Sequence, residues 1–138
     1  MSLDFEGKVA IVTGSGGGIG KGYALELGKR GAKVVVNDLG GAVDGSGGSL
    51  TAAETVVKEI QDNGGDAMAN GANVCNQDEV KNMVEQAMEK WGRVDVLVNN
   101  AGILRDKSFA KMPWEEFVTV VNVHLLCSAF CAQTAVSY

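Results

Sequence analysis

The residues best suited to bind a phosphate lie in one glycine-rich stretch near the amino terminus. The sequence TGSGGGIG runs from Thr13 to Gly20, directly after the apolar run Val9–Val12, and apolar residues recur at helical spacing beyond it. A strand, a glycine turn and a helix in this order present the free N–H groups of a helix N-terminus, and glycines let a phosphate approach without a Cβ in the way. The pattern predicts a pyrophosphate site, and the alternative is a plain turn between a strand and a helix.

The spacing of these glycines excludes two common phosphate-binding motifs. The P-loop has a Gly five residues before a Gly-Lys pair and a Ser or Thr after it, whereas Gly20-Lys21 has Ser15 before it and Gly22 after it. The Gly-x-Gly-x-x-Gly fingerprint of many dinucleotide sites has no match in this stretch either. The spacing that remains is Thr-Gly-x-x-x-Gly-x-Gly.

Two further polar groups follow expected strands. Asp38 stands at the end of the strand expected over 33–37, where a carboxylate accepts hydrogen bonds from the ribose hydroxyls of an adenosine and repels a 2′-phosphate. No Arg or Lys lies beside Asp38, so NAD is favoured over NADP; a solvated Asp in a turn is the alternative. The tetrapeptide 99–102, Asn-Asn-Ala-Gly, follows the strand expected over 94–98, at the edge where open α/β sheets bind ligands.

The elements that must position these residues alternate as β-α-β-α-β-α-β-α. Strands are expected at 9–12, 33–37, 66–70 and 94–98, with a helix over 18–30 and a last helix that starts near Trp114 and still runs at Tyr138. Strands that are apolar on both faces belong in a parallel sheet covered by helices on each side. We therefore expect one α/β domain over 1–138, a doubly wound, Rossmann-type half sheet of about four strands with the order 3-2-1-4.

Composition narrows the possible partners. The chain has 138 residues, 46% of them hydrophobic, and a net charge of −5, which argues against nucleic acid and anionic membranes as partners. No apolar stretch approaches the roughly 20 residues that span a bilayer, and no signal peptide precedes the first strand.

Three cysteines predict free thiols in a reducing, intracellular compartment. His124, Cys127 and Cys131 share one helix face, but zinc would need further ligands, so we favour buried cysteines over a metal site.

Four landmarks in this order resemble the short-chain dehydrogenase/reductase family: the Thr-Gly-x-x-x-Gly-x-Gly motif, Asp38, the Asn-Asn-Ala-Gly tetrapeptide and Asn122. Segments 37–41 and 99–109, together with Val123-His124-Leu125, are similar to the (3R)-hydroxyacyl-CoA dehydrogenase part of peroxisomal multifunctional β-oxidation enzymes. The resemblance covers the whole chain but only the first half of such a domain. It implies a peroxisomal location, with a cytoplasmic one as the alternative.

The resemblance assigns roles by position and implies NAD as the cofactor. Asn122 matches the helix asparagine of the family's catalytic tetrad, which supports a proton relay through water. Asn73-Val74 falls where the family has Asp-Val against adenine, and an amide can still hydrogen-bond the adenine amine. The residues placed against the dinucleotide are Gly14, Ser15, Gly18, Ile19 and Gly20 at the pyrophosphate turn, Asp38 at the adenosine ribose, Asn73 and Val74 at adenine, and Asn99, Ala101 and Gly102 at the nicotinamide ribose.

The chain departs from the family at the catalytic residues. The family uses a Ser and a Tyr-x-x-x-Lys pair, in which Lys lowers the pKa of Tyr; here Tyr23 is followed by Leu27, and Tyr138 is the last residue. We interpret the chain as the NAD-binding half of an enzyme that oxidises a hydroxyl of a small molecule to a ketone, and we expect this half to be inactive without the missing half. The resemblance implies an acyl-CoA substrate and a homo-oligomer.

Two physical consequences follow from this interpretation, and two alternatives stand beside it. The outer edge of the fourth strand and one face of the last helix are expected to be uncovered, which favours association. One alternative is a non-catalytic dinucleotide-binding or interaction module, which predicts a folded chain that binds NAD without any turnover. A broken product that binds nothing would instead aggregate.

Overall fold

A computed structural model describes residues 3–40 and 51–138 of the chain as a layered α/β fold. The strands are β1 (Val9–Val12), β2 (Lys33–Asn37), β3 (Asp66–Asn70) and β4 (Val96–Val98). The helices are α1 (Gly18–Lys29), α2 (Thr51–Asp62), α3 (Gln77–Trp91), the short 3-10 helix η1 (Phe109–Lys111), α4 (Trp114–Val121), the π-helical segment η2 (Asn122–Cys127) and α5 (Ser128–Val136). Residues 41–50, in the Gly/Ser-rich segment of the sequence that follows β2, lie outside the described residues.

The sheet has the predicted strand order. Its four strands are ordered β3-β2-β1-β4, and each neighbouring pair is parallel. The chain adds β2 and β3 on one side of β1 and then returns to place β4 on the other side. This reversal creates a switch point beside the carboxyl end of β1, where open α/β sheets bind their ligands.

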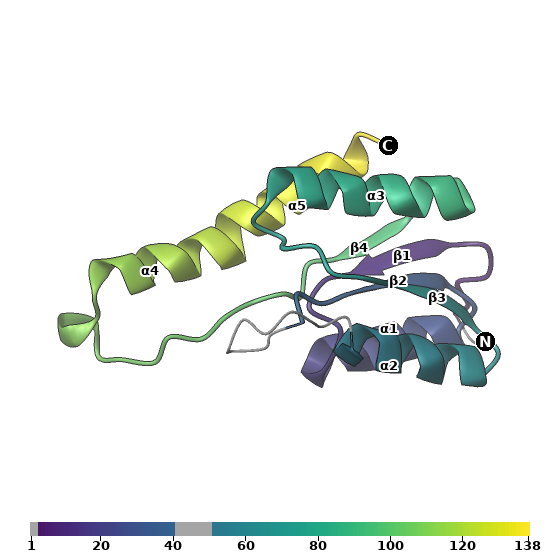
Figure 1. Ribbon diagram of the computed structural model, residues 1–138, viewed down its shortest axis with the longest axis horizontal. Coiled ribbons are helices and arrows are strands. Elements are labelled where there is room, and N and C mark those ends of the chain that lie inside the picture. Colours follow the sequence, from purple (N-terminus) through teal and green to yellow (C-terminus); the bar gives the residue numbers. More distant parts are fainter. Residues whose placement is uncertain (1–2, 41–50) are drawn as a thin grey trace.

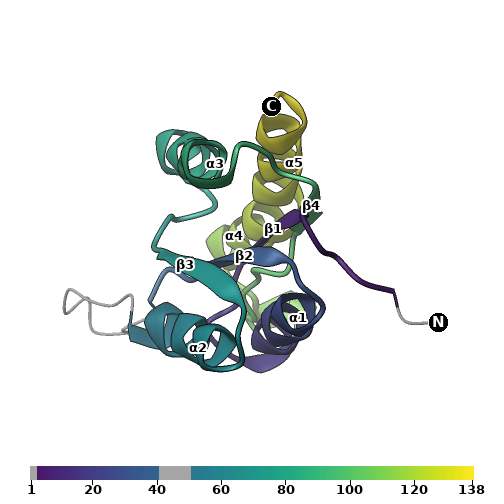
Figure 2. The same ribbon diagram turned by 90° about the vertical axis from the view of Figure 1, so that its right-hand side faces the viewer.

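Helices cover both faces of the sheet. α1 and α2 lie on one face, and α3 and α5 lie on the other (Figures 1 and 2). Side chains of β1 alternate between the two layers: Ala10 and Val12 join the cluster under α1 and α2, whereas Val9 and Ile11 join the cluster under α3. All four residues are at most 1% exposed, as expected for a strand covered on both sides.

The ends of α3 show why this segment is a helix of fixed length. The side chain of Asn76 accepts a hydrogen bond from the N–H of Glu79 at 3.1 Å, which satisfies one free donor of the first turn. Gly92 closes the helix with a φ of 76° and donates its N–H to Met88 O. A left-handed residue at this position is the common helix stop, and glycine adopts it without a steric penalty.

The fourth strand is shorter than predicted, beginning at Val96 and not at residue 94. The cause is Asp95, whose carboxylate accepts the N–H of Val9 at 2.9 Å, while its own N–H donates to Val9 O. A side chain thus occupies a position that a strand partner's carbonyl would otherwise fill. The Arg93 guanidinium bonds the same carboxylate and lowers the pKa of Asp95.

The last helix corrects the expectation that no segment reaches bilayer length. Trp114–Val136 is helical over 23 residues and is long and apolar enough to cross a membrane by length and composition alone. Its acidic residues, Glu115 and Glu116, are confined to the first turn. The residues after them are apolar or polar without an acidic group, so the helix continues as one long, largely apolar segment. Core helices of soluble proteins meet the same criterion, and the α5 part packs against α3.

Part of this helix is uncovered in the described chain, as the sequence predicts. The α4 end extends away from the sheet (Figure 1). Leu125 and Leu126 are 62% and 56% exposed, and Trp114 and Phe117 stack on each other with ring centroids 4.9 Å apart. Exposed apolar side chains clustered on one element indicate a surface on which further protein packs.

Candidate functional site

A cavity of about 400 Å³ opens at the carboxyl ends of the strands, beside the switch point. Six of the residues predicted to bind the cofactor line it, although they come from four separate segments: Gly14, Asp38, Asn73, Val74, Ala101 and Gly102. A larger, open hollow of about 870 Å³ lies at the opposite edge of the sheet, where Glu6, Arg30 and Gly64 border it. The sequence signals coincide with the smaller cavity, so this cavity is the candidate site.

The start of α1 offers unpaired backbone donors to an anion. The first helical hydrogen bond runs from Lys21 N to Gly17 O at 3.1 Å, so the N–H groups of Gly18, Ile19 and Gly20 precede it. The first turn contains no acidic residue, and a Cβ added at Gly17 or Gly18 would meet no atom within 4 Å. Open space, free N–H groups and the positive end of the helix dipole together fit a phosphate.

Gly14 and Gly20 are required by close packing of the turn against the end of β4. Gly14 has a φ of 62°, and a Cβ there would lie 2.8 Å from the Cα of Ala101. A Cβ on Gly20 would overlap both Gly14 O and the side-chain amide of Asn100. The glycine motif therefore holds the turn against the Asn-Asn-Ala-Gly segment as well as leaving space for a ligand.

Thr13 and Asn100 join the ends of β1 and β4. The Thr13 hydroxyl accepts the N–H groups of Asn100 and Ala101, each at 3.0 Å. In return, the Asn100 side chain donates to Thr13 O and Gly14 O, each at 3.0 Å. Thr13 is 1% exposed, so these part-buried bonds are anchored in the core and fix Ala101 and Gly102 at the cavity wall.

Substitution Thr13→Val is expected to loosen this junction. Valine keeps the shape of threonine but leaves two N–H groups without their acceptor, which should lower the free energy of unfolding by about 1–2 kcal/mol. Thr13→Ser keeps the hydroxyl and should lie much closer to the unsubstituted chain. Urea unfolding of the three proteins measures the difference, and equal stability of the Val and Ser variants would contradict the role of the hydroxyl.

The carboxylate of Asp38 is held in place at the cavity by two backbone donors. Its Oδ2 accepts the N–H of Gly16 at 3.0 Å, and its Oδ1 accepts the N–H of Gly40 at 2.9 Å. A Cβ on Gly16 would lie 2.7 Å from Oδ2, so only glycine allows this approach. The carboxylate thus connects the end of β2 to the phosphate-binding turn.

Buried amides beneath Asp38 hold the adjacent loop. Asn37 is 1% exposed and donates its side-chain N–H₂ to Asn70 Oδ1 and Ala72 O, each at 3.0 Å. The loop continues to Asn73, whose Oδ1 accepts the N–H of Cys75 at 2.9 Å. Asn73 and Val74 are thereby placed at the cavity, on the side of Asp38.

Ser15 lies in the turn but does not face the cavity. Its side chain is 0% exposed, its hydroxyl donates to Val12 O at 2.7 Å, and its N–H donates to Asn37 O at 2.7 Å. Both polar groups are used within the protein. Ser15 therefore positions the turn. Its hydroxyl and its N–H both donate within the protein, so neither can donate to a cofactor, although the sequence led us to expect this.

Besides Ser15, Asn99 and Asn122 are predicted site residues that lie away from the cavity, whereas Gly18, Ile19 and Gly20 lie beyond its lining in the turn that begins at Gly14. The side-chain amide of Asn99 donates to Ser128 O at 3.1 Å, and Asn100, which the sequence did not single out, lines the cavity in its place. Successive residues at a strand end point to opposite sides, which separates this pair. Asn122 is exposed and borders a second hollow, of about 250 Å³, with Gln77 and Phe130.

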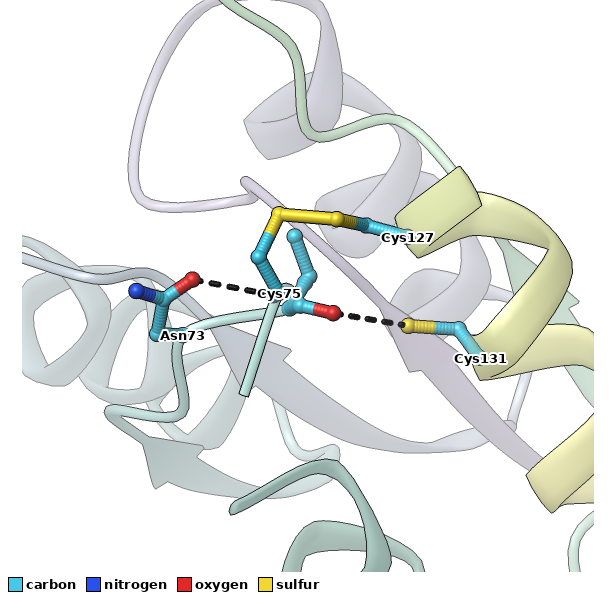
Figure 3. The surroundings of a disulfide bond; sticks show 5 residues. Asn73, Cys75, Cys127 and Cys131 are labelled. Carbon is cyan, nitrogen blue, oxygen red and sulfur yellow. Dashed lines mark hydrogen bonds between the residues drawn. A yellow bond between two sulfur atoms is a disulfide. The ribbon is translucent and has the colours of Figure 1, made fainter. Parts of the chain in front are cut away.

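The prediction of three free thiols is wrong for two of them. Cys75 and Cys127 form a disulfide that joins the loop after β3 to the π-helical segment (Figure 3). Cys131 remains free and buried, with its sulfur 3.9 Å from Val74 O, and burial raises the pKa of its thiol to about 11. Within residues 3–40 and 51–138, no group of His, Cys, Asp and Glu is arranged to hold a metal ion.

Comparisons with known proteins agree with the motifs and with the fold. The short chain dehydrogenase family matches residues 8–138. The peroxisomal hydratase-dehydrogenase-epimerase of Saccharomyces cerevisiae is 56% identical over 90% of this chain and 14% of that protein. The peroxisomal multifunctional enzyme type 2 of Mus musculus is 48% identical over 89% of this chain and 16% of that protein.

Solved structures give the same result. A short chain dehydrogenase from Mycobacterium avium superposes with a TM-score of 0.87 and 48% identity, over 96% of this chain and 47% of that one. A 7α-hydroxysteroid dehydrogenase complexed with NADH and 7-oxo glycochenodeoxycholic acid gives 0.86 and 35%, over 97% and 49%. This chain thus spans about half the length of these solved structures and less of the multifunctional enzymes. As its four landmarks predict, the chain belongs to the short-chain dehydrogenase family.

Proposed function

We propose that this chain is the NAD(H)-binding part of a dehydrogenase that oxidises a hydroxyl group to a ketone. The observation that carries the proposal is that three features adjoin at the carboxyl ends of the strands: two line the cavity, and the third lies in the turn that begins at Gly14. These are the free N–H groups at the start of α1, the oriented carboxylate of Asp38 and the small residues Ala101 and Gly102. A dinucleotide needs all three: an anion site, an acceptor for ribose hydroxyls and space for a second ribose.

The residues present fit a nicotinamide dinucleotide along the cavity. Gly18, Ile19 and Gly20 would bind the pyrophosphate through their N–H groups, and Asp38 would accept the adenosine ribose hydroxyls. The loop that carries Asn73 would flank adenine. Gly102, at the other end, would lie beside the nicotinamide ribose. The bound dinucleotide supplies the hydride acceptor, and the protein residues bind and orient it.

The charge of Asp38 favours NAD over NADP. A fixed carboxylate repels a 2′-phosphate placed at the hydroxyl it would otherwise bind. Its two backbone donors keep it from turning away. The same geometry therefore provides both the ribose contact and the discrimination.

Asp38→Asn is expected to reduce the preference for NADH over NADPH by about tenfold. The single amide oxygen can still accept the N–H of Gly16, so the phosphate-binding turn keeps its shape, although the bond from Gly40 is lost and the negative charge is gone. Calorimetric titrations with both nucleotides measure the ratio of dissociation constants. An unchanged ratio would show that Asp38 does not face the 2′ position.

The curated relatives support a more specific substrate. Several are named as peroxisomal multifunctional enzymes, so we propose a (3R)-hydroxyacyl-CoA as substrate and the peroxisome as location of the complete enzyme. The exposed Leu125 and Leu126 support a homo-oligomer that forms through the last helix. Since the sequence holds no Tyr-x-x-x-Lys, we expect residues 1–138 to bind NADH without hydride transfer.

Titration of the 138-residue chain with NADH tests this proposal. Saturable binding of one nucleotide per chain is the expected result, with no consumption of NAD when a 3-hydroxyacyl-CoA is added. Turnover by the chain alone would contradict the assignment of chemistry to residues absent here. Binding without turnover even beside the remainder of the enzyme would favour the non-catalytic module.

A further inference from the structure

We propose that His124, and not Asn122, is the helix residue that positions the nicotinamide end of the cavity. The inference rests on the proposed function, because it concerns the same dinucleotide site. His124 would act by holding the Gly102–Ile103 backbone against which the nicotinamide half of the ligand binds. It is a positioning residue, which acts through this backbone.

His124 contacts the cavity wall directly. Its Nε2 lies 2.8 Å from Ile103 O and 3.1 Å from Ile103 N. The ring also packs on Gly102, because a Cβ added there would be 2.5 Å from His124 Cε1. Gly102 and Ile103 both line the 400 Å³ cavity, so the ring supports the wall from behind.

The imidazole can keep this contact in either neutral tautomer. A protonated Nε2 donates to Ile103 O, and an unprotonated Nε2 accepts from Ile103 N–H. Each state makes one bond to the same residue. The contact therefore does not depend on which ring nitrogen carries the proton.

The helix geometry separates His124 from Asn122. Residues two apart on a helix point in roughly opposite directions, so the two side chains cannot serve the same cavity. Val123 lines the dinucleotide cavity beside His124, whereas Asn122 borders the hollow formed with Gln77 and Phe130. Both residues lie in the π-helical segment, a feature that often occurs at functional sites.

The wall needs such support because it is irregular. Residues 99–108 form neither helix nor strand, and they cross from the end of β4 to the 3-10 helix η1. The Asn100 and Ala101 N–H groups are held by Thr13, and the His124 ring holds the next residues along the chain. Loss of the ring would free Gly102 and Ile103 while leaving the glycine turn and Asp38 in place.

Two ligands and three variants test the inference. NADH contains the nicotinamide and its ribose, whereas ADP contains only the adenosine and pyrophosphate portions. We expect His124→Leu to weaken NADH binding about tenfold and ADP binding less than about threefold, as for a lost hydrogen bond at one end. His124→Gln, whose amide both donates and accepts, should restore most of the NADH affinity. Leu125→Gln, at an exposed neighbour, is the control and should bind both ligands as the unsubstituted chain does.

A ligand-free measurement makes the test independent of affinity. Amide hydrogen exchange at Ile103 should accelerate in His124→Leu and return towards the original rate in His124→Gln.

The inference is overturned if His124→Leu binds NADH normally, if it loses both ligands equally, or if Asn122→Leu produces the selective loss instead. If the unsubstituted chain binds neither ligand, the proposed function itself fails. If the unsubstituted chain binds NADH but His124→Leu shows no selective loss, only the role of His124 fails.

Discussion

Replacement of Gly14 by alanine is expected to abolish measurable dinucleotide binding and to destabilise the fold. Gly14 has a φ of 62°, a conformation that costs an L-residue with a Cβ about 1–2 kcal/mol. The new Cβ would also lie 2.8 Å from Ala101 Cα, and backbone atoms cannot move aside as a flexible side chain can. The turn would separate from the end of β4, so the phosphate site and the nicotinamide side would no longer face one cavity.

Gly22→Ala is the matched control for Gly14→Ala. Gly22 lies within α1, and a Cβ there would meet no atom within 4 Å. Alanine in a helix interior is favoured over glycine by up to about 1 kcal/mol, so this variant should be as stable as the original chain or more so. Thermal unfolding and NADH titration of the two variants make the comparison. Equal binding by both would contradict the close packing described for Gly14.

Reduction of the Cys75–Cys127 disulfide is expected to lower the free energy of unfolding by about 2–4 kcal/mol. The two cysteines are separated by 52 positions, so the bond restricts a long segment of the unfolded chain. In the folded chain it joins the loop that carries Asn73 to the helix that carries His124. Both ends of the cavity should therefore become more mobile after reduction.

The double variant Cys75→Ser, Cys127→Ser provides the control. A dithiol reductant should shift the unfolding midpoint of the unsubstituted chain and leave that of the double variant unchanged. Cys131 should not readily form a new disulfide with Cys75 or Cys127 after reduction, because its raised pKa of about 11 keeps the thiol protonated at neutral pH. Equal sensitivity of both proteins to reductant would contradict a stabilising disulfide.

The fold was predictable because the apolar pattern of the strands, the glycines after the helices and the order of the elements all indicate the same α/β sheet. Strands such as Val34-Val35-Val36 are apolar on both faces, glycines follow the helices, and the alternation of elements leaves few topologies. The strand order 3-2-1-4 and the bounds of β3 follow directly from these local signals. The start of β4 does not, because the carboxylate of Asp95 replaces a backbone partner, and no periodicity reports this.

The candidate site was predictable where backbone conformation and side-chain charge determine it. Gly14 and Asp38 belong to this group, since a left-handed turn and an acidic strand end have local signatures. Asn99 and Asn100 could not be told apart without knowing which one points into the cavity. The partnership of Cys75 with Cys127 and the contact of His124 with Ile103 depend on the tertiary fold. The π-helical segment that carries His124 has no signature in the spacing of its apolar residues.

The location of dinucleotide binding tests the central claim most directly. A titration of the isotope-labelled 138-residue chain with NADH, followed by amide NMR spectra, reports every backbone N–H at once. The account predicts saturable shifts at Gly18, Ile19, Gly20 and Gly102, with Gly64 and Gly65 at the opposite edge of the sheet unchanged. Shifts confined to that opposite edge, or no saturable shift at millimolar NADH, would contradict it.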